Sequence, residues 1–129
     1  MSYHLSKMVG LGFDAAVDAT IAALQAEGFG VLTDIDVAAT MHKKLGVAFR
    51  PYRILGACNP RMAHEALKLE DKVGTMLPCN VVVQQHDDGS VEVSAIDPVT
   101  SMQGIDNPEL ARLAGTVRDM LRSVVNRIA

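Results

Sequence analysis

The chain has 129 residues, 49% of them hydrophobic, and a formal net charge of −3, which is typical of one folded domain over residues 1–129. This composition excludes an intrinsically disordered chain, and the acidic balance argues against a nucleic-acid partner, because neutralising phosphates needs clustered Lys and Arg. Two cysteines are too few for a disulfide scaffold, and with aromatics at 4% the core has to be built from aliphatic side chains, Ala and Met.

The first half of the chain shows three strands and two helices. Weak alternation over residues 3–8 predicts the first strand, and apolar residues at helical spacing from Phe13 predict a helix that ends at Gly28. Residues 29–35 follow as a second strand. Asp36 then caps a shorter helix that stops at Gly46. The mostly apolar run 52–58 predicts a buried third strand.

The second half of the chain contains the same helix-start motif twice. Asn59-Pro60 opens a third helix and Asn107-Pro108 opens the last one, since Asn is a good N-cap and Pro suits the first helical position. Residues 71–78 are expected to form a loop, and residues 97–106 an irregular connection. Between them, the stretches 80–86 and 90–96 flank a short turn with Gly89 and predict a β-hairpin.

The resulting order is βαβαβαββα. This order allows parallel strand pairing early in the chain and an antiparallel hairpin late. It predicts an α+β fold in one compact domain, with helices packed on a mixed β-sheet.

Signals for a membrane or an export route are missing from the sequence. No run approaches the ~18 apolar residues that a membrane span needs, and the first residues lack the basic start and apolar stretch of a signal peptide. We therefore expect a cytoplasmic protein without a membrane partner.

The two cysteines have matched surroundings. Cys58-Asn59 and Cys79-Asn80 each lie at the edge of a predicted strand, and Cys58 also precedes a helix start, where free N–H groups favour a thiolate. If both strands end on the same side of the sheet, the thiols are neighbours.

Four interpretations of the cysteines stay open. The thiols can be buried structural residues, or redox-active or nucleophilic groups with a lowered pKa. They can also bind a soft metal together with His64 or His86, although the spacing does not match a zinc knuckle or ribbon.

The fourth interpretation is a small polar or anionic ligand held at the helix starts. The arginines near the first of these starts are Arg50, Arg53 and Arg61.

Other motifs are weak. The pair Gly10 and Gly12 lacks the third glycine of a dinucleotide fingerprint, and there is no P-loop and no serine nucleophile elbow. Because stacking platforms for nucleotides or flavins would have to come from five aromatic residues in all, we expect no cofactor and no resident metal.

The two cysteine motifs carry a resemblance to a known family. The segments that carry it are Gly56-Ala57-Cys58-Asn59-Pro60, Ala63, Ala66-Leu67, Leu77-Pro78-Cys79-Asn80-Val81-Val82-Val83 and Asp97-Pro98. In this pattern the chain resembles the family called domain of unknown function 302 over nearly its whole length. The resemblance implies a compact α+β domain that tends to form homodimers, and it implies no defined biochemical activity.

We therefore expect a homodimeric module that binds a small ligand or another partner, and enzymatic activity stays undecided. Uncovered edge strands of the sheet also favour a dimer. The candidate ligand-binding residues are Cys58, Asn59, Pro78, Cys79 and Asn80. The alternative is a thiol-dependent redox protein or a soft-metal-binding protein that uses Cys58 and Cys79.

Overall fold

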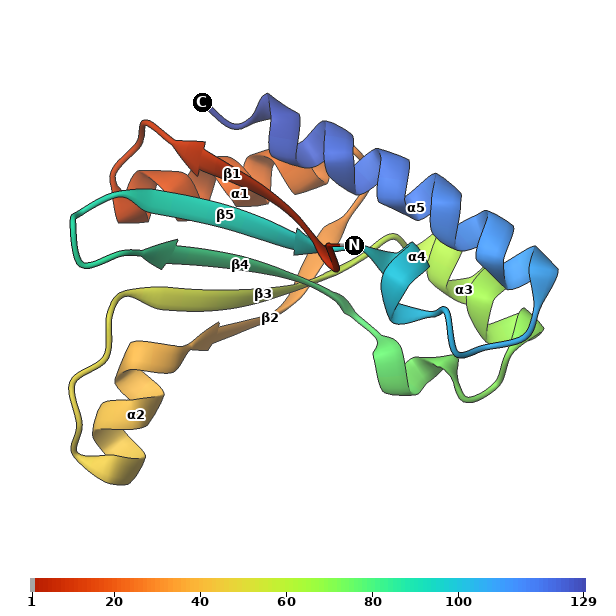
Figure 1. The fold of residues 1–129 in the computed structure, drawn as a ribbon, viewed down its shortest axis with the longest axis horizontal. Helices are drawn as coiled ribbons and strands as arrows, with labels where there is room; N and C mark the ends of the chain where they lie inside the picture. Colours follow the sequence, from red (N-terminus) through yellow and green to blue (C-terminus); the bar gives the residue numbers. More distant parts are fainter. Residues whose placement is uncertain (1) are drawn as a thin grey trace.

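A computed structural model describes residues 2–129 and contains one five-stranded sheet with the strand order β1-β5-β4-β3-β2 (Figure 1). Every neighbouring pair of strands is antiparallel. The α+β class is thereby confirmed. The strands are β1 (His4–Val9), β2 (Gly30–Asp36), β3 (Tyr52–Cys58), β4 (Cys79–Gln85) and β5 (Val91–Ile96).

The expected mixed sheet is wrong, because the helical connections do not create neighbouring parallel strands. Helix α1 (Phe13–Ala26) does cross over the sheet, but it joins β1 and β2, which lie at opposite edges. Helix α2 (Val37–Leu45) buries none of its residues and projects beyond the ends of β2 and β3 (Figure 1). Those two strands therefore return as antiparallel neighbours, as in a hairpin with a long connection.

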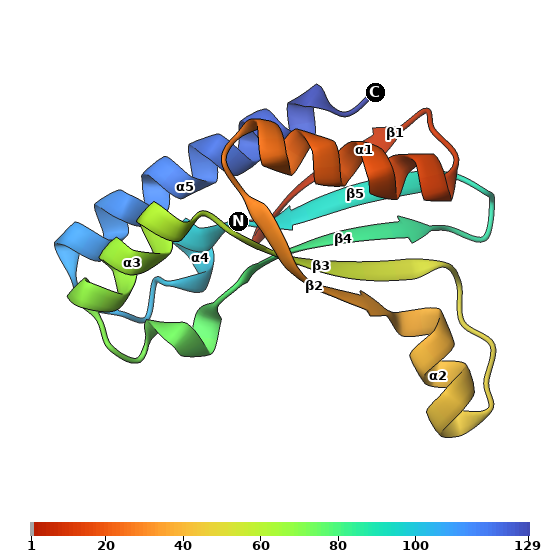
Figure 2. The same ribbon diagram turned by 180° about the vertical axis from the view of Figure 1, so that it is seen from behind.

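One face of the sheet is covered by helices. Helix α1 and the long helix α5 (Pro108–Arg127) both lie on this side (Figures 1 and 2). Inward-facing residues of β3, β4 and β5 pack against them, and along β4 and β5 the buried residues alternate with less buried ones, as one covered face requires. We call this cluster the main core; its buried members are Ala16, Val17, Ala23, Leu24, Phe29, Leu55, Ala57, Cys79, Val81, Val83, Val91, Val93, Ala95, Val117, Leu121, Val124, Val125 and Ile128.

A second, smaller cluster lies at one end of the sheet, and we call it the end cluster. It joins helix α3 (Pro60–Leu69), the 3₁₀ turn η1 (Val73–Met76), the short helix α4 (Pro98–Ser101) and the first half of α5 (Figure 1). Its buried members are Ala66, Val73, Met102, Leu110 and Ala114. The turn η1 and helix α4 lie in segments that the sequence predicted to be a loop and an irregular connection.

The predicted helix boundaries are largely confirmed. Asn59 and Asn107 accept backbone hydrogen bonds as N-caps of α3 and α5, and Asp36 does the same for α2. Gly28 and Gly46 adopt positive φ angles of 85° and 65° after α1 and α2, a conformation that glycine adopts at low cost.

No helix within residues 2–129 covers the opposite face of the sheet, and we call it the open face. Residues such as Ser6, Ser94, Val82 and Ile54 alternate with the main-core residues along their strands and therefore point to this side. Within residues 2–129, no helix combines the length and the apolar character needed to cross a membrane.

Candidate functional site

The register of the sheet brings the two cysteine motifs together. Ala57 pairs with Cys79, and Gly56 pairs with Asn80, so the end of β3 lies beside the start of β4. Helix α3 begins at this same end of the sheet, directly after Cys58 and Asn59. The matched Cys-Asn motifs are thus neighbours in space, as the sequence predicted for strands that end on the same side.

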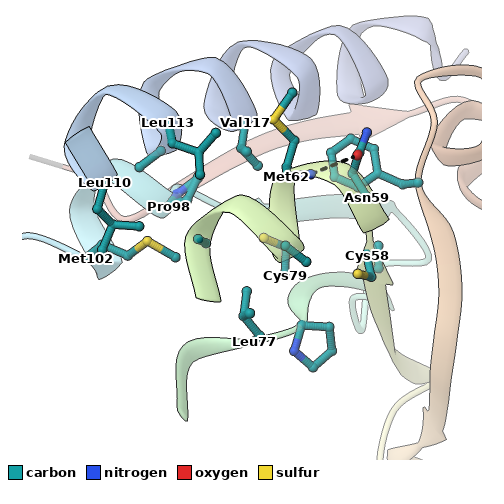
Figure 3. A pocket seen from close by; sticks show the side chains of 16 residues that line it. Cys58, Asn59, Met62, Leu77, Cys79, Pro98, Met102, Leu110, Leu113 and Val117 are labelled. Atoms are coloured by element: carbon teal, nitrogen blue, oxygen red, sulfur yellow. Dashed lines mark hydrogen bonds between the residues drawn. The ribbon is translucent and has the colours of Figure 1, made fainter. Parts of the chain in front are cut away.

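A cavity of about 40 Å³ lies at this junction, between the main core and the end cluster (Figure 3). Four of the five predicted site residues line it, namely Cys58, Asn59, Pro78 and Cys79. The other lining residues are Phe29, Ala57, Met62, Ala63, Ala66, Leu77, Pro98, Met102, Leu110, Leu113, Ala114 and Val117. None of the lining side chains carries a formal charge.

The two thiols differ in their surroundings. Cys79 is 8% exposed and belongs to the main core, whereas Cys58 is half-buried at the end of β3. Burial, with a smaller contribution from the neighbouring Cys58, raises the pKa of Cys79 to about 11. Both cysteines are free. They are offset by one residue in the ladder, and successive strand residues point to opposite faces, which disfavours a direct disulfide.

Asn59 connects the cavity to the end of α1. Its Oδ1 accepts a hydrogen bond of 3.3 Å from the backbone N–H of Met62, which caps α3. Its Nδ2 packs against Gly28, where an added Cβ would lie only 3.1 Å away. This contact, together with the positive φ of Gly28, explains why the α1–β2 turn contains glycine and fixes the Asn59 amide at one end of the cavity.

Gly56 and Pro78 form a close contact on the other side of β3. A Cβ at Gly56 would overlap Thr33 Oγ1 and would lie 2.7 Å from Cγ of Pro78. The peptide bond between Leu77 and Pro78 is cis. Packing across the sheet therefore requires glycine at this position of the motif.

Asn80 is not part of this cavity. It is exposed on the open face and lines a separate shallow groove there together with His4, Tyr52 and Ser94. Next to this groove, Ser6 Oγ lies 2.6 Å from Nδ1 of His4 and donates a hydrogen bond of 2.7 Å to Ser94 Oγ.

A model of the family domain of unknown function DUF302 matches residues 5–128. The chain belongs to this family. A crystal structure of an uncharacterized conserved DUF302 protein from Bacillus stearothermophilus is similar to this DUF302 domain, with a TM-score of 0.93 and 28% sequence identity over 100% of both chains. Among curated proteins no significant match is found.

The arginines and histidines considered for the site lie elsewhere in this DUF302 domain. Arg53 forms an ion pair with Asp34 that lowers the pKa of this carboxyl group, and Arg50 lies over the ring of Phe49. His86 contacts Glu92 at 3.0 Å.

His64 and Arg61 are exposed on α3 and do not line the cavity. Among residues 2–129, no three His, Cys, Asp or Glu side chains gather as metal ligands. The polar groups of the cavity therefore come from its cysteines and Asn59 alone.

The sequence did not predict the wall of the cavity that α4 and α5 provide. The pair Asp97-Pro98 is the local signal for part of this wall, because Asp97 caps α4 by accepting a bond from the Val99 N–H, two residues on, whereas the Asn caps accept from the third residue. A cap at Asp97 predicts a short helix at this point, and Met102, which lines the cavity, follows that helix. The remaining wall residues from α5 are Leu110, Leu113, Ala114 and Val117.

Proposed function

We propose that this DUF302 domain is a binding module for a small molecule, held in the cavity at the ends of β3 and β4. The observation that supports this most directly is the place of the cavity on the boundary between two separate hydrophobic clusters. Apolar walls with a few polar groups at one end are typical of small-molecule sites. Cys58, Asn59 and Cys79 supply those polar groups, and Pro78 is part of the wall.

Native mass spectrometry of protein purified from the producing cells tests the proposal. We expect an added mass on the wild-type chain. This mass should be lost when Ala114, which lines the cavity, is replaced by Phe. It should be kept in Ala111→Phe, which places the same ring at an exposed position of the same helix. Wild-type protein without added mass would contradict the proposal.

We also infer a homodimer that covers the β2 edge of the sheet. Strand β2 is an edge strand with six of its seven residues exposed, and α2 buries nothing. Leu32 and Leu45 are 67% and 69% exposed on these two elements. An uncovered edge strand followed by an unpartnered helix favours pairing with a second copy, because both would otherwise stay hydrated.

Light scattering at micromolar concentration tests the dimer. The wild-type chain should have twice the monomer mass, and Leu45→Glu should return it to the monomer mass. The matched control is Leu67→Glu, which places the same charge at an exposed position on α3, away from β2. A wild-type monomer, or a dimer that Leu45→Glu leaves intact, would overturn this interface.

The alternative function, redox chemistry or soft-metal binding at Cys58 and Cys79, has less support. With a pKa of about 11, on the order of one Cys79 thiol in 10⁴ is ionised at pH 7, and the thiolate is the reactive form. Alkylation with iodoacetamide followed by peptide mass mapping checks this: modification of Cys79 as fast as an unfolded control would revive the alternative.

A further inference from the structure

From the lining of the cavity we infer the chemical class of its ligand: an uncharged molecule, with a short alkyl chain or a single small ring and at most one hydrogen-bond acceptor. This inference rests on the proposed small-molecule function. It specifies which molecules the cavity should bind and which it should exclude. The presence of a cavity alone does not specify this.

The first argument concerns charge. The lining contains no Asp, Glu, Lys, Arg or His, so a charged ligand would lose its hydration without gaining an ionic partner. Such a transfer is strongly unfavourable. The protein's own Cys79 shows the same effect, since burial beside this cavity favours its neutral thiol.

The second argument concerns polarity along the cavity. Figure 3 shows Asn59 and Cys58 on one side of the view and Leu110 and Met102 on the other, with Cys79 between them. The Oδ1 of Asn59 is already used by the cap of α3, and its Nδ2 packs against Gly28, so the thiols are the remaining side-chain donors at this end. Thiols are only weak donors. This end therefore offers a ligand little hydrogen bonding, which suits a molecule with at most one acceptor.

The third argument concerns size. A cavity of about 40 Å³ is large enough for a water molecule, whereas benzene has been held by a cavity on the order of 150 Å³. A larger guest must therefore move part of the wall. Two methionines line the cavity, the half-buried Met62 and the buried Met102. Their unbranched side chains adapt to irregular shapes and can make room for such a guest. This limits the guest to one small ring or a short chain.

The test compares three probes of equal length that differ in charge: 1-hexanol, hexanoate and hexylammonium. Each is titrated into full-length protein with ¹³C-labelled methionine methyl groups, and single Met→Leu variants assign the signals. We expect 1-hexanol to shift the Met62 and Met102 methyl signals in a saturable way. Hexanoate and hexylammonium should bind at least about tenfold more weakly, because each must bury a charge.

Two variants link the shifts to the cavity. Ala114→Leu fills the space and should abolish the shifts, while Ala111→Leu, on the exposed side of the same helix, should keep them. If Ala114→Leu does not fold, as judged by circular dichroism, Leu113→Phe at a half-buried lining position replaces it.

The outcomes separate the two proposals. Saturable binding of hexanoate or hexylammonium that equals or exceeds that of 1-hexanol would overturn the ligand class, yet it would leave the cavity as a binding site. Methyl signals that respond to none of the three probes would also overturn the ligand class. The proposed function is decided independently by the native mass spectrum and its Ala114→Phe control.

Discussion

The two hydrophobic clusters of this domain differ in size and in the elements that form them. The main core joins eighteen buried residues from three strands, two helices and their flanking residues, whereas the end cluster has five buried residues from α3, η1, α4 and α5 and their connections. Helix α5 contributes to both, and the cavity lies where they meet. The difference indicates that the main core holds the fold together, while the end cluster is the part that would adapt to a guest under the proposed function.

The largest effect should come from a pair of Leu→Ala substitutions on α5. Leu121 is fully buried in the main core, and Leu110 is equally buried in the end cluster but lines the cavity. We expect Leu121→Ala to cost about 3–5 kcal/mol of unfolding free energy and Leu110→Ala about 2–3 kcal/mol, because Leu110 already lacks contacts on its cavity side.

Urea denaturation at equilibrium measures both values on one helix with the same chemical change. A cost for Leu110→Ala that equals or exceeds that of Leu121→Ala would remove the distinction between the two clusters. Hydrogen exchange measures the local stability of the two clusters independently: amides of α3 should exchange faster than those of β4.

The next effect is the alkaline pH dependence caused by Cys79, at the main-core side of the boundary. Its pKa is raised from an ordinary value near 9 to about 11, so the folded state keeps a proton that the unfolded state releases. The stability from this group is present below pH 9 and is lost as the pH rises toward 11. The expected loss is about 2–3 kcal/mol.

Denaturation curves of the wild type and of Cys79→Ala, recorded between pH 8 and pH 11, isolate this effect from other groups that titrate there. Cys79→Ala should lower stability at pH 8 but flatten the slope above pH 9. Cys58→Ala is the matched control and should keep most of the wild-type slope, because burial is the larger cause of the raised pKa of Cys79 and Cys58 is the smaller one. Equal slopes in the wild type and Cys79→Ala would show that the Cys79 thiol does not resist ionisation.

Local features of this fold follow from the sequence, and its assembly does not. The caps at Asn59, Asn107 and Asp36 depend on residues three positions away, so their patterns predict them. Strand pairing depends on whether a connecting helix lies on the sheet, and α2 shows that an apolar spacing such as Val37, Met41, Leu45 does not decide this.

In the candidate site, too, some features follow from local sequence patterns and others depend on how distant segments pack together. The matched motifs predicted Cys58 and Cys79 as neighbours only if both strand ends lie on the same side of the sheet, and the pairing of Ala57 with Cys79 meets that condition. The predicted place of Asn80 was wrong because the strand is predicted to begin at residue 80; in the structure β4 begins at Cys79, so alternation turns Asn80 to the open face. The cavity itself depends on how two clusters fit together, and no local pattern encodes such a fit.

A smaller loss is expected for Gly56→Ala, which disturbs the sheet beside the cavity. The new methyl group would overlap Thr33 Oγ1 and press on the ring of Pro78. The hydroxyl of Thr33 can rotate away, but the proline ring cannot yield as easily. We expect a cost of about 1–3 kcal/mol.

The double variant Gly56→Ala/Thr33→Ala measures how much each neighbour contributes. Removing the Thr33 hydroxyl should recover part of the loss and leave the part that is due to Pro78. Complete recovery would show that Pro78 does not constrain this position. A fully stable Gly56→Ala single variant would contradict the close packing itself.

The smallest effects should come from the two Asn-Pro caps, which lie at the starts of α3 and α5. Asn59 makes one cap hydrogen bond, to the Met62 N–H. Asn107 accepts a bond of 3.1 Å from the Leu110 N–H and also donates one of 3.0 Å to the Leu69 carbonyl, which ties the start of α5 to the end of α3. We expect Asn59→Ala to cost about 0.5–1 kcal/mol and Asn107→Ala about 1–2 kcal/mol.

Serine at each position separates the cap from the second bond, because a hydroxyl caps a helix well but does not reach as far as an amide. Asn59→Ser should recover nearly all of the stability in urea denaturation. Asn107→Ser should recover only the cap and stay less stable than the wild type, since the link to Leu69 is lost. If both serine variants regained full stability, the bond between α5 and α3 would contribute nothing, and the end cluster would be held together by its apolar contacts alone.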